Sequence, residues 1–148
     1  AQERPQIDSD RQNVTLGMIG LDTNVLVRFL VRDHPAQYEK SRRLIESQVA
    51  SGQPVFVSLL VLLETEWVLR SRYNLAKTEL AEALSALLDT TEIVFEDERA
   101  VEEALYVWKR SNADFADCLI GVRNRRLGCD VTATFDARAA KLEGYMAA

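Results

Sequence analysis

Short apolar runs alternate with longer amphipathic stretches along most of the chain. Four of these runs are predicted as strands, at residues 18–21, 54–57, 92–96 and 129–136. The amphipathic stretches are predicted as helices, at residues 24–31, 35–51, 58–73, 77–89, 98–110, 114–127 and, closing the chain, 137–144. Strands separated by helices predict βαβ units, and therefore an α/β fold with a mostly parallel sheet covered by helices on both sides.

The first seventeen residues do not share this pattern. They are polar and aperiodic, and Met18 then opens the first apolar run. We interpret residues 1–17 as an N-terminal extension or an expression remnant. Residues 18–148 are then expected to form one domain, long enough to bury a sizeable core.

Composition removes several classes of function. The longest uninterrupted apolar run, residues 59–63, is too short to span a bilayer. The two cysteines, Cys118 and Cys129, form no metal-ligand spacing and no disulfide framework, so a reduced, cytoplasmic location is expected. The only histidine, His34, precedes a proline in a loop-like stretch. Histidine-based catalysis and a multi-histidine zinc site are therefore disfavoured.

Net charge is −5 at pH 7, but the positive charges are clustered. The clusters consist of arginines only: Arg42 with Arg43, Arg70 with Arg72, and Arg123 with Arg125 and Arg126. Each cluster is consistent with a solvated helix face. The same clusters would also serve as phosphate contacts in a protein whose acidic groups hold cations.

Two acidic residues follow predicted strands directly. Asp22 comes after the strand at 18–21, and Asp136 ends the strand at 129–136. Ligands of open parallel sheets bind beyond the carboxyl ends of the strands, which makes both residues candidates for a site. An aspartate between a strand and a helix is also a favoured N-cap, so each has a structural alternative.

Glu64 and Glu66 lie in the same predicted helix but on different faces. At about 100° per residue, Glu64 falls between Leu60 and Val68, with Trp67 close by. A carboxylate within an apolar stripe is costly unless it is protonated, paired or bound to a metal. Glu64 is therefore predicted as a functional residue, with a buried Glu–Arg pair as the alternative. Glu66 is predicted to form an ordinary surface pair with Arg70.

The stretch DFADCLIG places Asp114 and Asp117 on one helix face, where like charges repel. Ser111 followed by Asp114 matches a capping box, so Asp114 has a structural alternative. Asp117 lies one turn deeper, on a stripe with Gly121 and Asn124. The stripe could simply be solvated. Gly121 has no side chain, however, and would leave room for a ligand, and a cation between the carboxylates would turn their repulsion into binding.

The candidates are all carboxylates: Asp22, Glu64, Asp114, Asp117 and Asp136. Oxygen ligands select a hard divalent ion, Mg²⁺ or Mn²⁺, over zinc. Sites of this kind hydrolyse phosphodiesters with one or two ions. No phosphate-binding glycine loop of the Walker or dinucleotide type is present, which disfavours a nucleoside triphosphate and favours a nucleic-acid backbone as substrate.

Four segments in this order and spacing resemble the PIN-domain nucleases, and among them most closely the VapC-type toxins of bacterial toxin–antitoxin systems. The segments are LDTNVLVRFLVRD, SLLVLLETEWVLR, DFADCLIG and TFD, and the resemblance covers residues 18 to 143. It implies a compact three-layer α/β/α sandwich around a short, mostly parallel sheet. The residues that match the family's core acids are Asp22, Glu64, Asp117 and Asp136, with Asp114 as an additional acid of many members.

The resemblance also implies an activity and partners. The activity would be Mg²⁺- or Mn²⁺-dependent endoribonuclease cleavage, with Asp22, Glu64, Asp117 and Asp136 as catalytic residues. A toxin member would commonly form a homodimer and would be neutralised by a cognate antitoxin protein. Two alternatives stay open: a PIN ribonuclease of RNA processing or quality control without an antitoxin, and a catalytically silent PIN-like interaction module. Retention of all four core acids argues against the silent module.

Overall fold

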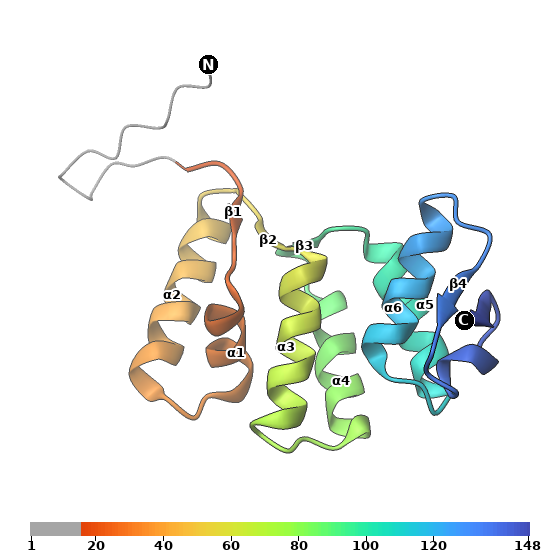
Figure 1. Cartoon of the computed structure of the whole chain (residues 1–148). Helices are drawn as coiled ribbons and strands as arrows, with labels where there is room; N and C mark the ends of the chain where they lie inside the picture. Colours follow the sequence, from red (N-terminus) through yellow and green to blue (C-terminus); the bar gives the residue numbers. More distant parts are fainter. Residues whose placement is uncertain (1–15) are drawn as a thin grey trace.

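The computed structural model describes residues 16–148, in which helices alternate with short strands (Figure 1). The elements in chain order are β1 (Ile19–Gly20), α1 (Thr23–Val31), α2 (Pro35–Ala50), β2 (Val55–Val57), α3 (Leu59–Ser71), α4 (Lys77–Leu88), β3 (Ile93–Phe95), α5 (Glu98–Lys109), α6 (Phe115–Arg126), β4 (Thr132–Thr134), the 3-10 turn η1 (Ala139–Lys141) and β5 (Tyr145–Ala147). The predicted extension at residues 1–17 lies outside the described residues, apart from Leu16 and Gly17. No helix in the described range is long and apolar enough to cross a membrane.

The predicted boundaries of α1 to α6 agree with the structure to within two residues. Local capping explains part of this agreement. The Ser58 hydroxyl accepts a hydrogen bond from the Val61 amide at 3.2 Å, at the start of α3. Pro35 occupies the first turn of α2, and the Nδ1 atom of His34 caps that helix by accepting from the Gln37 amide at 3.2 Å. The single histidine therefore has a structural role.

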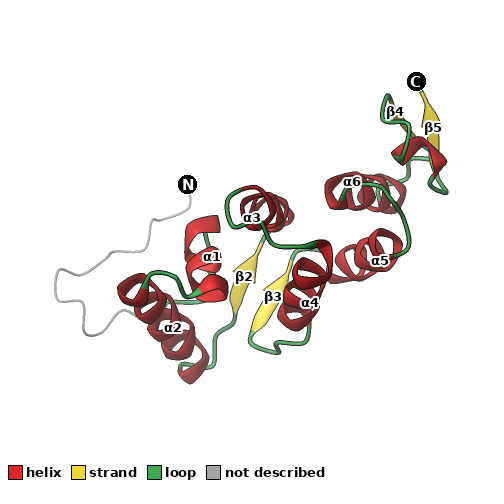
Figure 2. Ribbon diagram, turned by 90° about the horizontal axis from the view of Figure 1, so that it is seen from below, coloured by secondary structure: helices red, strands yellow, loops and turns green. Residues whose placement is uncertain are grey.

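The strands form two parallel sheets rather than one. β2 lies between β1 and β3, with Ile19 opposite Val55 and Val55 opposite Ile93. Among residues 16–148, β4 pairs only with β5, with Thr132 opposite Tyr145. The predicted fold class, an α/β/α arrangement around short parallel strands, is confirmed. The expectation of one sheet is wrong for this chain, because α5 and α6 separate β4 from the other strands (Figures 1 and 2).

The predicted closing helix at 137–144 is also wrong. Only the short turn η1 forms there, and the chain then returns as β5. Gly144 adopts a φ of +83°, a left-handed conformation that a helix cannot contain, and so turns the chain into β5. The apolar residues of this segment were therefore assigned to the wrong kind of element.

A continuous apolar core fixes the start of α6. Phe115, the first residue of α6, is fully buried and meets the Trp108 ring of α5 edge-on at 5.2 Å between ring centroids. Ala113 and Leu119 are buried beside it. Because the residues on either side of Asp114 are held in the core, the backbone that carries Asp114 and Asp117 is fixed in position.

Candidate metal centre

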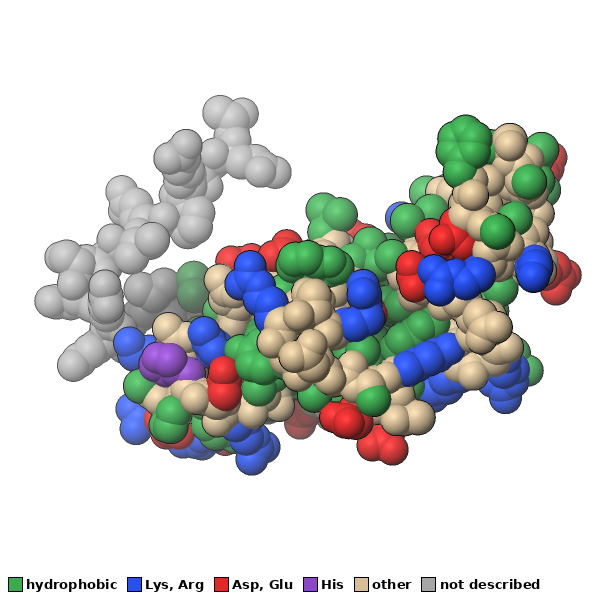
Figure 3. Space-filling view, turned by 60° about the horizontal axis from the view of Figure 1, so that its bottom comes forward, with side chains coloured by type: hydrophobic (Ala, Val, Ile, Leu, Met, Phe, Trp, Pro, Cys, Tyr) green, Lys and Arg blue, Asp and Glu red, His purple; other side chains and the backbone are tan. Residues whose placement is uncertain are grey.

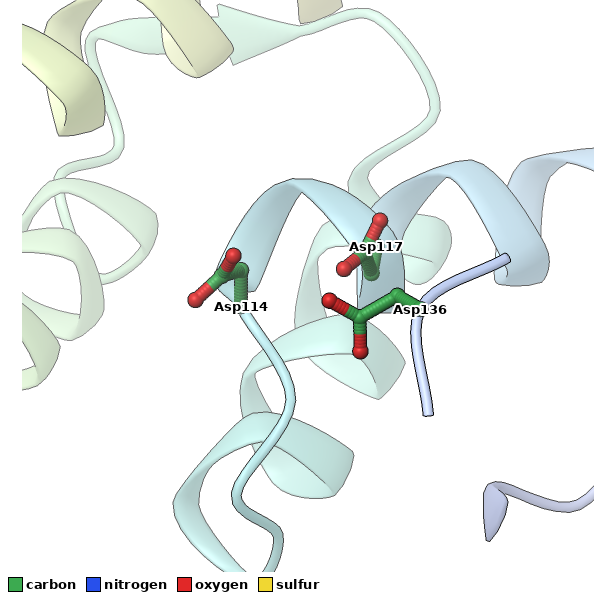
Figure 4. Close-up of side chains that lie close together, drawn as sticks. All are labelled: Asp114, Asp117 and Asp136. Carbon is green, nitrogen blue, oxygen red and sulfur yellow. The ribbon is translucent and has the colours of Figure 1, made fainter. Parts of the chain in front are cut away.

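Three aspartates from two elements converge at the start of α6. One carboxylate oxygen each of Asp114, Asp117 and Asp136 lies within 4.8 Å of the other two (Figure 4). We searched residues 16–148 for groups of at least three acidic, histidine or cysteine side chains close enough together to hold a metal ion. These three aspartates form the group that meets this condition. The structure thus brings together three of the five predicted carboxylates, including both members of the DFADCLIG pair.

Asp114 reaches the cluster because it is not used as a cap. It occupies the N-cap position of α6, but its side chain accepts no capping hydrogen bond. The capping alternative for Asp114 is therefore not what the structure shows. Asp117 follows one turn later and points to the same side (Figure 4).

Asp136 follows β4 and is oriented by its own backbone. Its Oδ1 atom accepts hydrogen bonds from the amides of Arg138 and Ala139, each at 2.9 Å. Its amide donates to the Thr134 hydroxyl at 3.0 Å. The capping alternative for Asp136 is thus present in part, but it engages one carboxylate oxygen and still leaves Asp136 within reach of Asp117.

Contacts along α6 hold β4 and β5 in place. The Tyr145 hydroxyl donates to the backbone carbonyl of Asp117, and the Tyr145 ring lies against Gly121 in the space that a side chain would fill. The Asn124 amide donates to the Thr132 hydroxyl at 3.1 Å. The space at Gly121 was predicted to admit a ligand, and this is wrong because Tyr145 fills it. These contacts of Gly121 and Asn124 instead hold β4 and β5 against α6, so that Asp136 lies beside Asp117.

The three carboxylates perturb one another. Burial raises the pKa of Asp117, the charges of Asp136 and Asp114 raise it further, and Arg138 opposes the shift. The pKa of Asp136 is lowered, chiefly by the hydrogen bond from the Ala139 amide and then by that from Arg138. Asp117 is therefore the aspartate of the cluster whose ionised form is destabilised in the folded chain.

Arg138 is the nearest cation and was not identified from the sequence. Its Nη2 atom lies 3.8 Å from Asp114 and 3.7 Å from Asp136, too far for hydrogen bonds. More than half of its side chain is exposed. Arg138 offsets part of the negative charge without occupying the space between the carboxylates. In the sequence, only its position two residues after Asp136 could have indicated that Arg138 lies beside the cluster.

The donor set fits a hard divalent cation. All three groups offer carboxylate oxygens. Burial and then the charges of Asp136 and Asp114 raise the pKa of Asp117, and a cation between the carboxylates would offset those charges. Cys118, in the same helix, is buried, and burial raises the pKa of its thiol. A thiolate ligand that would select zinc is thus disfavoured there.

Asp22 and Glu64 do not join the three aspartates in this chain. Asp22 is exposed at the N-cap of α1, where its Oδ1 atom accepts from the Thr23 amide at 2.8 Å. Glu64 is exposed on α3. The capping role predicted as the alternative for Asp22 is therefore present.

The structure buries a different face of α3 from the face that was predicted to be buried. Glu66 is only 2 % exposed, whereas Leu60 and Trp67 are 79 % and 50 % exposed. The face of α3 that packs into the core carries Leu62, Thr65, Glu66 and Leu69. Both faces contain apolar residues, so periodicity did not distinguish the core face from the face that Leu60, Glu64 and Trp67 share.

Glu66 pairs with Arg70 as predicted, but the pair is not a surface pair. The Arg70 Nε atom lies 3.0 Å from Glu66 Oε1, with the carboxylate buried and the guanidinium about half exposed. The buried Glu–Arg pair considered for Glu64 therefore belongs to Glu66. Removing Arg70 would leave the buried Glu66 carboxylate without its ionic partner, and removing Glu66 would break the hydrogen bond to Arg70. Glu66 therefore has a structural role.

A cavity of about 450 Å³ has Asp114 of the cluster in its wall. Its charged and polar lining consists of Glu66, Arg70, Lys77, Asn112, Asp114 and Arg138. The Lys77 ammonium donates to the Ser111 carbonyl at 2.7 Å. The cavity wall thus carries three cations, Arg70, Lys77 and Arg138, together with the carboxylates of Glu66 and Asp114.

Most members of the other arginine clusters are engaged in ion pairs. Arg42 and Arg43 bind Glu39 in α2. Arg123 and Arg126 both bind Asp97, at 2.9 and 2.8 Å. For these clusters the structure supports the helix-face interpretation.

Comparison with known proteins assigns the chain to a family. The PIN domain family matches residues 19–145, which include every helix and strand from β1 to η1 and the first residue of β5. The chain belongs to the PIN-domain family. A protein named VapC ribonuclease from Aquifex aeolicus (strain VF5) is 25 % identical over 122 residues, which cover 82 % of this chain and 90 % of that protein.

Within this PIN domain, the electrostatics of the cluster make a prediction about stability. A carboxyl with a raised pKa favours the folded state below its ordinary pKa, and that contribution is lost as pH rises through the raised pKa. At neutral pH, Asp117→Asn removes this unfavourable charge, so the metal-free variant should melt at a higher temperature than the parent. Melting curves with EDTA test this.

The same variant should respond less to metal. Saturation of the parent at a hundredfold excess over Kd stabilises it by about 2.7 kcal/mol, and Asp117→Asn removes one ligand. Asp130→Asn, a change at an exposed aspartate outside the cluster, is the matched control and should behave as the parent. Equal metal-induced shifts in parent and Asp117→Asn would exclude Asp117 from the site.

Proposed function

We propose that this PIN domain is a divalent-metal-dependent endoribonuclease and the toxin of a type II toxin–antitoxin system. The convergence of Asp114, Asp117 and Asp136 is the observation that carries the proposal. The relative named VapC ribonuclease supports RNA as the substrate. The proposed partners are RNA, a cognate antitoxin protein and a second copy of the chain, and the proposed location is the cytoplasm.

The proposed metal ligands are Asp22, Glu64, Asp114, Asp117 and Asp136, and Asp22, Glu64, Asp117 and Asp136 are the proposed catalytic set. When bound, Mg²⁺ or Mn²⁺ activates a water as nucleophile and offsets charge on the scissile phosphate. The aspartates at the start of α6 would hold the cation, and Asp136 is kept in place by the two backbone amides that donate to it.

Arg138 and the adjoining cavity would hold the nucleic-acid backbone. The guanidinium of Arg138 lies beyond hydrogen-bond distance of both neighbouring carboxylates, so its N–H groups are free to donate to a phosphate oxygen. Arg70 and Lys77 border the same cavity and add positive potential. The net charge of −5 therefore coexists with a local surface that attracts phosphate.

Metal dependence gives a direct test of the reaction. Cleavage of RNA should require Mg²⁺ or Mn²⁺, cease with excess EDTA and return when metal is added in excess of the chelator. A zinc-selective chelator should have no effect, because the ligands are oxygens. Undiminished cleavage in excess EDTA would contradict the proposed mechanism.

Glu64 and Glu66 form a matched pair for mutation. Glu64→Gln should abolish cleavage and leave the free energy of unfolding unchanged, because the Glu64 side chain is exposed. Glu66→Gln should lower the free energy of unfolding by about 1–3 kcal/mol, because the buried group loses its ionic hydrogen bond to Arg70. It should still cleave at temperatures where it is folded. Loss of cleavage in folded Glu66→Gln but not in Glu64→Gln would reverse the assignment.

The toxin role is tested in cells. Induced expression should arrest growth, an Asp22→Ala variant expressed to the same level should not, and co-expression of the product of a small upstream reading frame should relieve the arrest. An RNA-processing PIN ribonuclease would cleave RNA in vitro without growth arrest. A silent interaction module would do neither.

A further inference from the structure

Arg138 is the cation beside the acidic cluster, and its side chain forms no hydrogen bond with another residue among 16–148. Its Nη2 atom lies 3.8 Å from Asp114 Oδ2 and 3.7 Å from Asp136 Oδ2, and 56 % of the side chain is exposed. Hydrogen bonds from a guanidinium to a carboxylate are shorter, at about 2.7–2.9 Å. The guanidinium therefore attracts both carboxylates but can move away from them without breaking a hydrogen bond.

The other two cations in the cavity wall are held in place. Arg70 is paired with Glu66 at 3.0 Å, and the Lys77 ammonium donates to a backbone carbonyl at 2.7 Å. Arg138 shares the wall of this cavity with Asp114. Acidic and basic side chains meet where the protruding C-terminal part joins the rest of the chain (Figure 3). Arg138 is thus the cation of the cavity wall that can turn either to the cluster or to an anion in the cavity.

The backbone of Arg138 is fixed, although its side chain is not. The Arg138 amide and the Ala139 amide both donate to Asp136 Oδ1, each at 2.9 Å. The second oxygen of Asp136, Oδ2, is the one that faces the guanidinium. Because Oδ1 already accepts two hydrogen bonds, Oδ2 is the oxygen left for a metal ion. A metal ion and Arg138 would therefore share the same oxygen.

A divalent ion bound at these oxygens would be repelled by Arg138. Such an ion lies about 2.0–2.6 Å from its oxygen ligands, which places it within about 6 Å of the guanidinium. In water, a single and a double positive charge about 6 Å apart change an affinity about tenfold, and salt at about 0.15 M reduces the effect to about threefold. Arg138 therefore stabilises the metal-free cluster and opposes metal binding to it.

We propose that Arg138 couples metal binding at the three aspartates to binding of a phosphate group in the adjoining cavity. Without ligands, the guanidinium faces the carboxylates and weakens their affinity for a divalent ion. A phosphate oxygen in the cavity accepts hydrogen bonds from the guanidinium and draws it away from the carboxylates, so the ion binds more tightly. The coupling is reciprocal, so a bound ion strengthens phosphate binding by the same factor. That the phosphate belongs to RNA rests on the proposed function; the coupling does not.

Metal affinity without any substrate is the first test. Titrations with Mn²⁺, followed by electron paramagnetic resonance, give the Kd of the parent and of Arg138→Gln. The variant should bind Mn²⁺ about threefold to tenfold more tightly, and the difference should shrink as salt is added. In EDTA it should melt at a lower temperature than the parent, because the cluster has lost its nearest cation. Asp117→Asn is expected to shift both quantities in the opposite direction.

Two further variants separate the charge from other effects. Arg138→Lys keeps the charge and should bind Mn²⁺ as the parent does. Arg99→Gln removes an exposed cation at the start of α5 and changes the net charge by the same amount as Arg138→Gln. The start of α5 is tied to the end of α6 by the pair of Asp97 with Arg126, whereas the cluster lies at the start of α6. The length of α6, about 18 Å, exceeds the Debye length, so Arg99→Gln should leave the Mn²⁺ affinity unchanged.

The coupling itself is the second test. A short, fluorescently labelled single-stranded DNA presents the phosphate backbone without the 2′-hydroxyls of RNA. Its Kd is measured with EDTA and with Mn²⁺. Mn²⁺ should tighten DNA binding to the parent, and this gain should be about threefold smaller for Arg138→Gln and retained for Arg138→Lys.

The two tests and an RNA-cleavage assay separate the coupling from the proposed function. Equal Mn²⁺ affinities of the parent and Arg138→Gln, or an equal gain in DNA affinity, would overturn the coupling even if the parent cleaves RNA. A parent that shows the coupling but leaves RNA intact in Mn²⁺ would contradict the proposed function and support the coupling.

Discussion

The packing of β4 and β5 against α6 determines where the acidic residues meet. Gly121 makes this packing possible, because the Tyr145 ring takes the place of a side chain and its hydroxyl reaches the Asp117 carbonyl. Burial in this contact raises the pKa of Tyr145 to about 12 and keeps its hydroxyl protonated as a donor. Asp136 follows β4 directly, so any loosening of this contact would separate Asp136 from Asp117.

The resulting cluster concentrates negative charge that the protein only partly offsets. Arg138 is close enough to weaken the negative potential of the cluster, but too far away to form a hydrogen bond with Asp114 or Asp136. Burial, and then the charges of Asp136 and Asp114, raise the pKa of Asp117. A cation that fits between the carboxylates would supply what Arg138 does not, which links the stability of the folded chain to metal binding. The cavity beside the cluster adds cations on its other side, where a phosphate backbone would approach.

The sequence by itself determined the local features. Apolar periodicity and caps such as Ser58 and Pro35 set the six long helices and four of the strands, because these signals act within a few residues. The spacing of Asp114 and Asp117 on one helix face, and the position of Asp136 after a strand, followed in the same way. The family resemblance extended these local signals to the acids of the site.

Only the tertiary structure decided which faces meet. On α3, two stripes of apolar residues compete, and long-range packing selects the one with Leu62 and Leu69, which buries Glu66 and exposes Glu64. The pairing of β5 with β4, the occupation of Gly121 by Tyr145 and the approach of Arg138 all join residues that no local pattern relates. The split of the sheet has the same origin, since strand pairing depends on where α5 and α6 carry the chain rather than on the residues of the strand itself.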